Sequence, residues 1–168
     1  MRLLVVRHAI AVERGTRGMA DDERPLTPRG RARFQEAARG LTTLLARPGV
    51  LLSSPVRRAR ETARILARAW KPLVVTLEPV LADGSPEQVD EMLRAHRERT
   101  LVALVGHEPH LSELLAYALG KATPTALEFK KGGAALLDVP GRLVSGARLV
   151  WFLPPKVLRQ IVGDRVGR

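Results

Sequence analysis

Two short runs of aliphatic residues in this chain each end at a histidine. Residues 3–6 are Leu, Leu, Val and Val and lead into Arg7 and His8, while residues 101–105 are Leu, Val, Ala, Leu and Val and lead, after one glycine, into His107. Uninterrupted apolar runs of this length are typical of central strands in a parallel sheet covered on both faces. Ligands bind beyond the carboxyl ends of such strands. The sequence therefore predicts that both histidines and Arg7 lie at one functional edge of an α/β sheet.

Strand-like and helix-like segments alternate along the chain. The strand candidates are residues 2–6, 49–53, 73–77, 100–105, 133–138 and 147–152. Three Ser/Thr-Pro pairs predict helix starts, because the hydroxyl can cap free N–H groups and proline suits the first helical position. These pairs are Thr27-Pro28, Ser54-Pro55 and Ser85-Pro86, and a fourth helix is expected between Pro109 and Gly120. This order predicts an α/β fold with three layers, in which helices cover both faces of a mostly parallel, doubly wound sheet. Pro140-Gly141 favours an antiparallel pair formed by the last two strands.

The length and composition limit the class of protein. With 168 residues, 45% of them hydrophobic, the chain is expected to form one domain over residues 1–155, with residues 156–168 as a C-terminal helix or tail. The absence of cysteine excludes disulfides, thiolate catalysis and cysteine-ligated metals. No segment approaches the roughly 18 apolar residues of a membrane span. The start of the chain is too short and too soon charged for a signal peptide, so we expect no membrane partner and a cytoplasmic location.

The formal net charge of +11 raises the question of a nucleic-acid partner. The arginines are dispersed, acidic residues are interleaved with them, and no basic cluster carries aromatic residues. We therefore expect no dedicated nucleic-acid partner, since no recognition motif accompanies the charge. The positive field would instead concentrate anionic substrates near the site.

The residue types at the two strand ends suit phosphoryl chemistry. Arginine's planar fork matches the oxygens of a phosphoryl group, and a neutral imidazole beside it can attack phosphorus. A strand followed by a helix start near Pro55 offers a further anion site. Arg57, Arg58 and Arg60 follow, but they cannot all enter one pocket, because successive helical residues turn by about 100°. Ordinary alternatives remain for each motif, namely a strand-end salt bridge, a solvated helix face, or a histidine bonded to backbone.

Four motifs together resemble those of the histidine phosphatase superfamily, which has the phosphoglycerate-mutase-like fold. In order along the chain they are Arg7-His8-Ala9, Pro25-Leu26-Thr27-Pro28-Arg29-Gly30, Ser54-Pro55-Val56-Arg57-Arg58-Ala59-Arg60-Glu61-Thr62-Ala63 and Gly106-His107. The small size and the Arg-His-Ala start are most similar to the SixA-like phosphohistidine phosphatases. The resemblance covers roughly residues 1–155.

This resemblance implies a role for each matching residue. His8 would be the nucleophile that becomes transiently phosphorylated, and Arg7, Arg58 and His107 would bind the phosphoryl group and neutralise its charge. Neutralising this charge is the main catalytic contribution in phosphoryl transfer. No cofactor and no metal are expected. His8 has to be unprotonated to attack, whereas a charged His107 would help, so the two are expected to titrate at different pH values.

The general acid is the least defined part of the expected site. Glu78, Asp83 and Glu87 lie in the region where larger family members place a carboxylate, and Asp83 is our first choice. SixA-like enzymes tend to lack a clear acid, because protonated phosphohistidine expels neutral imidazole, a good leaving group. Glu108 and His110 beside His107 could suggest a metal site, but adjacent loop positions rarely converge without a distant partner.

The expected function is that of a phosphatase with a phosphohistidine intermediate. Its expected partner is a protein that carries phosphohistidine. The first alternative is a phosphomonoesterase or mutase of the same superfamily that acts on a small phosphorylated metabolite. A less favoured alternative is a non-catalytic module that binds phosphate or nucleic acid.

Overall fold

A six-stranded sheet forms the middle layer of the protein. In the computed structural model, which describes residues 1–71, 73–120, 123–144 and 146–161, the strands lie in the order β3-β2-β4-β1-β5-β6. Neighbours among the first four are parallel, whereas β5 runs antiparallel to both β1 and β6. The strands are β1 (Arg2–Arg7), β2 (Val50–Ser53), β3 (Val75–Leu77), β4 (Leu101–Gly106), β5 (Ala134–Asp138) and β6 (Arg148–Leu153). The prediction of a mostly parallel sheet with a final antiparallel pair is confirmed.

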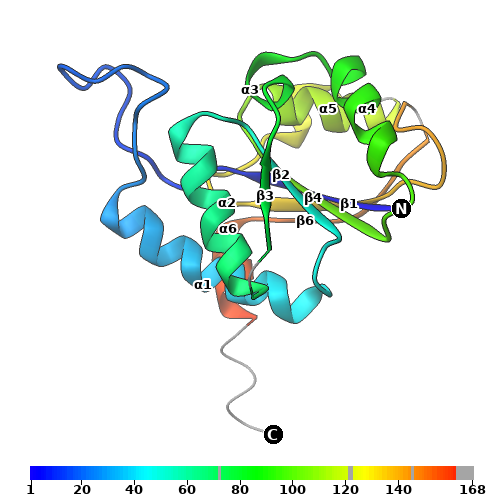
Figure 1. Ribbon diagram of the computed structural model, residues 1–168, viewed down its shortest axis with the longest axis horizontal. Coiled ribbons are helices and arrows are strands. Elements are labelled where there is room, and N and C mark those ends of the chain that lie inside the picture. The colour runs from blue at the N-terminus through cyan, green and yellow to red at the C-terminus, as the bar shows by residue number, and fades with distance from the viewer. Residues whose placement is uncertain (72, 121–122, 145, 162–168) are drawn as a thin grey trace, which may run out of the picture.

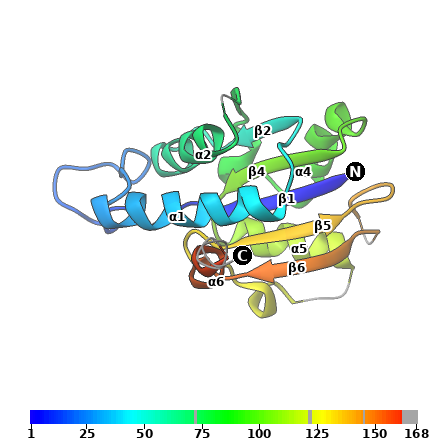
Figure 2. The same ribbon diagram turned by 90° about the horizontal axis from the view of Figure 1, so that it is seen from below.

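Helices cover both faces of this sheet and complete the three predicted layers (Figures 1 and 2). One face carries α1 (Pro28–Leu44), α2 (Arg57–Ala69) and α6 (Pro155–Gln160). The opposite face carries α3 (Val80–Asp83), α4 (Pro86–Leu93) and α5 (His110–Leu119). Two short 3₁₀ turns are η1 (Arg94–His96) and η2 (Pro124–Leu127). No helix in the described part of the chain is both long enough and apolar enough to cross a lipid bilayer.

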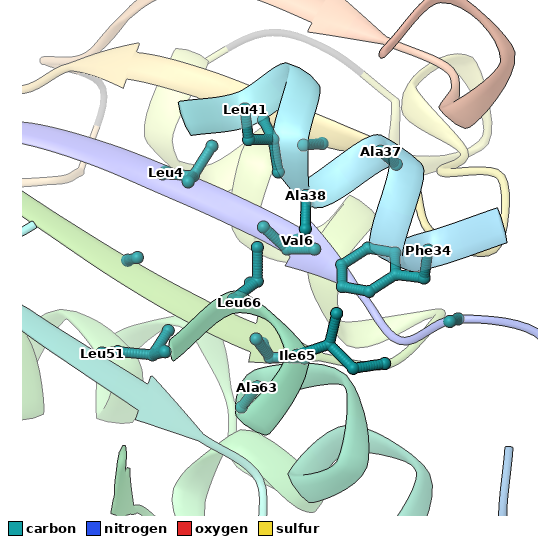
Figure 3. Packing of buried hydrophobic residues seen from close by; sticks show 14 of the residues in the cluster. Leu4, Val6, Phe34, Ala37, Ala38, Leu41, Leu51, Ala63, Ile65 and Leu66 are labelled. Carbon is teal, nitrogen blue, oxygen red and sulfur yellow. The ribbon is translucent and has the colours of Figure 1, made fainter. Parts of the chain in front are cut away.

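Strand β1 shows why its apolar run is uninterrupted. Leu4 and Val6 face α1 and α2, where Figure 3 shows Val6 close to Phe34 of α1. Leu3 and Val5 point to the opposite face and contribute to the second apolar cluster. All four side chains are fully buried. Because successive strand residues face opposite sides, a strand between two helical layers has no position for a polar residue.

All three predicted helix starts are confirmed to within two residues, and two of them have the expected hydroxyl at the N-cap. The Thr27 hydroxyl accepts a hydrogen bond from the Gly30 N–H at 2.9 Å. Ser85 and Gln88 form a reciprocal capping box at the start of α4. The third helix, α2, begins at Arg57, two residues after Pro55, and its N-cap residue is the extended Val56, which makes no side-chain cap. Ser54 is held at the sheet edge instead, where its own N–H donates to the carbonyl of Val105, in β4, at 3.0 Å.

Helix α3 was not predicted from the sequence. It has four residues, too few to display a helical period. Its Leu81 is buried in the same apolar cluster as α4 and α5. A Cβ atom at Gly106 would lie 3.6 Å from the Leu81 carbonyl oxygen, so α3 runs close to the end of β4.

Helix α6 is held against α1 at a glycine. A Cβ atom at Gly40 would lie 2.0 Å from the carbonyl oxygen of Leu158, which is fully buried. We expect Gly40→Ala to destabilise the fold by about 1–3 kcal/mol, because the backbone of α6 would have to move. Alanine's better helix propensity favours the opposite sign, so a loss would identify the steric contact as the dominant effect.

Chemical unfolding in urea measures the effect of Gly40→Ala. Gly141→Ala is the matched control, because a Cβ atom there meets nothing within 4 Å. A stable Gly40→Ala variant would show that α6 does not depend on this close approach.

The parallel register brings three strand ends to the same edge of the sheet. Arg7 at the end of β1 pairs with Gly106 in β4, and Ser53 at the end of β2 pairs with Val105. The loop between β1 and α1 extends beyond this edge, at the left of Figure 2. Residues that follow β1, β2 and β4 therefore meet here.

Candidate active site

Backbone hydrogen bonds fix the positions of the residues that follow the strands. The His8 N–H donates to the Gly106 carbonyl at 3.1 Å, which holds the chain after β1 beside β4. The Gly132 N–H donates to the His8 carbonyl at 3.0 Å, so the turn before β5 also lies against His8. His8 and His107 are brought together in this way, with ring centroids 5.1 Å apart and ring planes inclined by 50°.

The hydrogen-bond partners of His8 determine its tautomer. Nδ1 lies 2.7 Å from the Ala9 carbonyl oxygen, which can only accept, so the imidazole proton is on Nδ1. Nε2 lies 3.3 Å from Nε of Arg58, a group that can only donate. Burial, followed by the nearby cationic groups, lowers the pKa of His8 to about 3 despite the opposing bond to Ala9. His8 is therefore neutral at physiological pH and keeps a lone pair on Nε2.

Arg58 lies inside the site, whereas its neighbour Arg57 lies at the surface. The Arg58 side chain is 9% exposed, and its terminal nitrogens bind Asp21 through the backbone carbonyl at 2.7 Å and the carboxylate at 3.3 Å. The Arg57 side chain is 42% exposed and pairs with Glu61 at 3.2 Å. Both placements agree with the expectation that the arginines of this stretch cannot share one pocket.

Arg7 is held by the segment that precedes β5. One of its terminal nitrogens donates to the Phe129 carbonyl. The Phe129 N–H donates to one oxygen of Glu108 at 2.9 Å, and the other oxygen accepts from Ser112 at 2.5 Å. Glu108 thus fixes the carbonyl that holds Arg7. Nε of Arg7 is buried and has no hydrogen-bond partner among the described residues.

His107 is also buried and neutral. Its Nε2 lies 2.8 Å from the hydroxyl of Ser54, which is fully buried. Burial, then the cationic Arg58, lowers the pKa of His107 to about 3. His107 is therefore neutral in this fold, like His8, whereas a charged His107 was expected from the sequence to be the more helpful form. Taking an imidazolium out of water beside two arginines costs more than the fold supplies.

These side chains line one cavity of about 340 Å³. Its lining residues are Arg7, His8, Glu13, Arg14, Arg24, Arg58, His107, Glu108 and Lys131. Asp83 is exposed at the end of α3 and is not among them. Across the described ranges there is no group of three metal-ligating side chains with the geometry to hold an ion. The cavity is thus a cationic pocket around two neutral imidazoles.

Sequence reasoning missed several groups at this site. Asp21 had no role in the sequence-based expectations, and Ser54 was expected only to cap a helix. Glu13 lines the cavity from the same loop as Asp21. The one local signal was an acidic pair in a loop that directly follows His8. Nothing local indicated that Ser54 would contact His107, because the two lie 53 residues apart.

The two buried imidazoles predict how stability depends on pH. In the unfolded chain each titrates near pH 6.5, whereas in the fold the pKa of each is about 3. Their stabilising contribution is complete above pH 6.5 and is lost as pH falls from 6.5 toward 3. In this window the unfolded chain binds protons that the fold excludes. Each imidazole should lower the free energy of unfolding by about 1.4 kcal/mol per pH unit.

Urea unfolding of the wild type and of His107→Asn across this pH range tests the expectation. The variant lacks one titrating group, so its free energy of unfolding should fall less steeply with pH. Equal slopes would mean that His107 is already protonated in the fold.

Comparisons with known proteins agree with this geometry. The family model described as "Histidine phosphatase superfamily (branch 1)" matches residues 3–88. An uncharacterised protein of Picosynechococcus sp. is 38% identical over 138 residues, which cover 79% of this chain and 82% of that protein. A crystal structure of a candidate phosphohistidine phosphatase SixA from Agrobacterium tumefaciens is 29% identical, with a TM-score of 0.79 and coverage of 92% of this chain and 97% of that chain.

The fold is also that of a protein histidine phosphatase SixA solved in complex with tungstate. That structure has a TM-score of 0.82 at 23% identity and covers 94% of this chain and 99% of that chain. The match in fold, together with the family model and the Picosynechococcus relative, leads to one assignment. This chain belongs to the histidine phosphatase superfamily.

Proposed function

We propose that this protein is a phosphatase that removes phosphoryl groups from phosphohistidine in proteins, with His8 as the nucleophile. The observation that carries the proposal is the state of His8. Its Nε2 is unprotonated and accepts a hydrogen bond from Nε of Arg58 at 3.3 Å, and His8 lines a cavity that Arg7 and His107 also line. A neutral nucleophile beside fixed positive charge is the arrangement that phosphoryl transfer requires.

The proposed reaction has two displacements at phosphorus. Nε2 of His8 attacks the phosphorus, the bond from phosphorus to the leaving nitrogen breaks, and that nitrogen keeps the electron pair. Water then attacks the phosphohistidine, the P–N bond to His8 breaks, and inorganic phosphate leaves. In both steps Arg7 and Arg58 bind the phosphoryl oxygens and neutralise their charge, and the neutral His107 binds them as a hydrogen-bond donor. Arg58 is within reach of Nε2 and can follow the group as it moves to His8.

The choice of a phosphohistidine substrate follows from the leaving group. When the phosphorylated imidazole is protonated on its second nitrogen, it departs as a neutral molecule and needs no proton from the enzyme. Asp83 is exposed outside the cavity lining, and Glu108 already binds Phe129 and Ser112 through its two oxygens. Glu13, the other carboxylate of the lining, is exposed to solvent. A site with weak provision for proton donation favours a labile P–N bond over the ester of an alkoxide.

A panel of substrates at equal concentration tests this choice. It should contain a phosphohistidine peptide, sugar phosphates and an aryl phosphate. We expect kcat/KM for the phosphohistidine peptide to exceed that for the sugar phosphates by at least about tenfold, because differential transition-state binding sets such ratios. Faster turnover of a sugar phosphate would favour a metabolite phosphomonoesterase or mutase instead.

The role of Asp83 as general acid is a separate proposal with its own test. A general acid contributes on the order of 10²–10⁴-fold where the leaving group needs a proton. We expect Asp83→Asn to lose activity on sugar phosphates and to keep most of it on the phosphohistidine peptide. Glu13→Gln is the comparison variant, because it makes the same carboxylate-to-amide change at a residue that lines the cavity, whereas Asp83 does not line it. Equal, large losses on both substrates in Asp83→Asn would favour the monoesterase.

Asp21 is expected to hold Arg58 in its orientation. Asp21→Asn keeps the backbone carbonyl that accepts from Arg58 but removes the charge that pairs with it. The Asp21 side chain is 43% exposed, so we expect a loss in kcat/KM of at most about fivefold, in line with ~0.2–1 kcal/mol for an exposed ion pair. Asp22→Asn makes the same charge change at the next position of the loop and should keep the wild-type rate. Equal losses in both variants would attribute the effect to net charge.

A further inference from the structure

We propose that Ser54 is a positioning residue that holds His107 as the Nδ1–H tautomer. In this tautomer the Nδ1–H group of His107 donates a hydrogen bond to a phosphoryl oxygen of the substrate. This inference rests on the proposed function and assigns a role to a residue outside the expected catalytic set. It follows from the hydrogen-bond partners that each polar atom of Ser54 and His107 has in the fold.

The position of Ser54 is fixed by the sheet. It directly follows β2, and its N–H donates to the Val105 carbonyl at 3.0 Å. Val105 is two residues before His107, so this bond places the Ser54 side chain beside the imidazole. Ser54 is fully buried and His107 is 5% exposed, so water has little access to either group. Their hydrogen bonds therefore have to be made within the protein.

The hydroxyl proton of Ser54 has one acceptor. Oγ accepts from the Val56 N–H at 3.3 Å, a bond that uses a lone pair and leaves the proton available. In the described part of the chain, the acceptor in reach of that proton is Nε2 of His107, 2.8 Å away. If Nε2 carried the imidazole proton instead, the Ser54 O–H would be buried without an acceptor, at a cost of about 1–3 kcal/mol. Ser54 therefore donates, and Nε2 of His107 accepts.

The proton of the neutral imidazole is then on Nδ1. This nitrogen is buried and has no hydrogen-bond partner among the described residues, although His107 lines the cavity beside His8. Nε of Arg7, from another cavity-lining residue, is buried and unpartnered in the same way. Two donors of this kind around the His8 nucleophile suit the oxygens of a phosphoryl group, which can only accept when ionised.

The tautomer can be observed directly by NMR. In ¹⁵N-labelled protein, long-range ¹H–¹⁵N spectra distinguish a protonated ring nitrogen from a bare one, and His107→Asn assigns the signals. We expect Nδ1 of His107 to be protonated and Nε2 to be bare in the wild type. In Ser54→Ala the signals should shift toward a mixture of tautomers. A wild-type His107 protonated on Nε2 would overturn the proposal.

Kinetics separate positioning from a structural role. We expect Ser54→Ala to lower kcat about tenfold with little change in KM, less than the 10²–10³-fold cost of deleting such a donor outright. Ser54→Thr keeps the hydroxyl and should recover most of the rate. In a His107→Ala background, Ser54→Ala should cost nothing further, because its target is gone. An equal loss in both backgrounds would show that Ser54 acts only through the fold.

Ser53→Ala is the matched control. Ser53 is equally buried, and its hydroxyl donates to the Ser54 carbonyl at 2.9 Å rather than to an imidazole. It should leave the NMR signals of His107 and the ratio of kcat to KM unchanged. The two proposals also fail separately. An inactive wild type would refute the phosphatase and with it the catalytic use of His107, while an active wild type with the other tautomer would refute only the role of Ser54.

Discussion

Replacing His8 with alanine is expected to abolish turnover, with a loss on the order of 10³-fold or more in kcat, as for removal of other covalent nucleophiles. The reason is geometric. His8 has the Nε2 lone pair that lies beside Arg58 in the cavity, and the other imidazole at the site, that of His107, has its Nε2 bound to Ser54. The measurement is the release of phosphate from the phosphohistidine peptide, with folding checked by circular dichroism.

The covalent intermediate gives a second readout for His8. Wild-type protein mixed with radiolabelled substrate and quenched with denaturant should retain a label that is stable in alkali and lost in acid, as expected for a P–N bond. His8→Ala should retain none. His96→Ala is the control, because His96 lies in η1, apart from the cavity. A fully active His8→Ala variant would refute the mechanism with His8 as the nucleophile. A wild type that binds anions with steep salt dependence and shows no turnover would indicate a binding module.

Replacing Arg58 with alanine is expected to cause the second largest loss, on the order of 10²–10³-fold in kcat/KM. Charge neutralisation of the transferring group is the main catalytic contribution of such a site. Arg58 has its Nε 3.3 Å from the nucleophilic nitrogen, and its side chain is 9% exposed. Affinity for inorganic phosphate should fall together with the rate, since the same guanidinium binds product and transition state.

Arg57→Ala is the matched control for Arg58→Ala. It removes the same side chain from the adjacent helical position, yet Arg57 points to Glu61 at the surface. Its activity should stay near that of the wild type. Arg58→Lys should recover only part of the activity, because an ammonium cannot contact Asp21 and the phosphoryl group in the same fork geometry. Equal losses in the two alanine variants would show that the site responds to total charge rather than to one placed guanidinium.

Several elements of the fold were predictable because their signals are local. The apolar runs of β1 and β4 are uninterrupted because both faces of these strands are buried. The Thr27 and Ser85 caps depend only on N–H groups three residues away in the chain. The same reasoning was incomplete at Ser54, whose hydroxyl accepts from the N–H of Val56, the N-cap residue of α2, but also lies 2.8 Å from Nε2 of His107. A local rule fails where a distant residue offers the better hydrogen bond. Helix α3 was missed because four residues carry no period.

Charge states also depended on the folded environment. The sequence indicated two histidines near arginines, and from this alone a charged His107 was reasonable. Burial lowers the pKa of each imidazole more than any single neighbouring charge does, and both rings are almost fully buried. The contact between Asp21 and Arg58 also depends on the tertiary structure, because the two residues lie 37 positions apart in the chain.

The sequence by itself determined the layered α/β fold and the edge at which Arg7, His8 and His107 meet. Parallel strands place their carboxyl ends together, so residue types that follow buried runs identify the site without any distance. The motif match had already indicated Arg58 as the arginine of α2 that binds the phosphoryl group. Only the tertiary structure decided which nitrogen of each imidazole is bare and which groups hold the rings and Arg58 in place. Those outcomes depend on orientation over a few ångströms between segments far apart in the chain, and no local pattern encodes such distances.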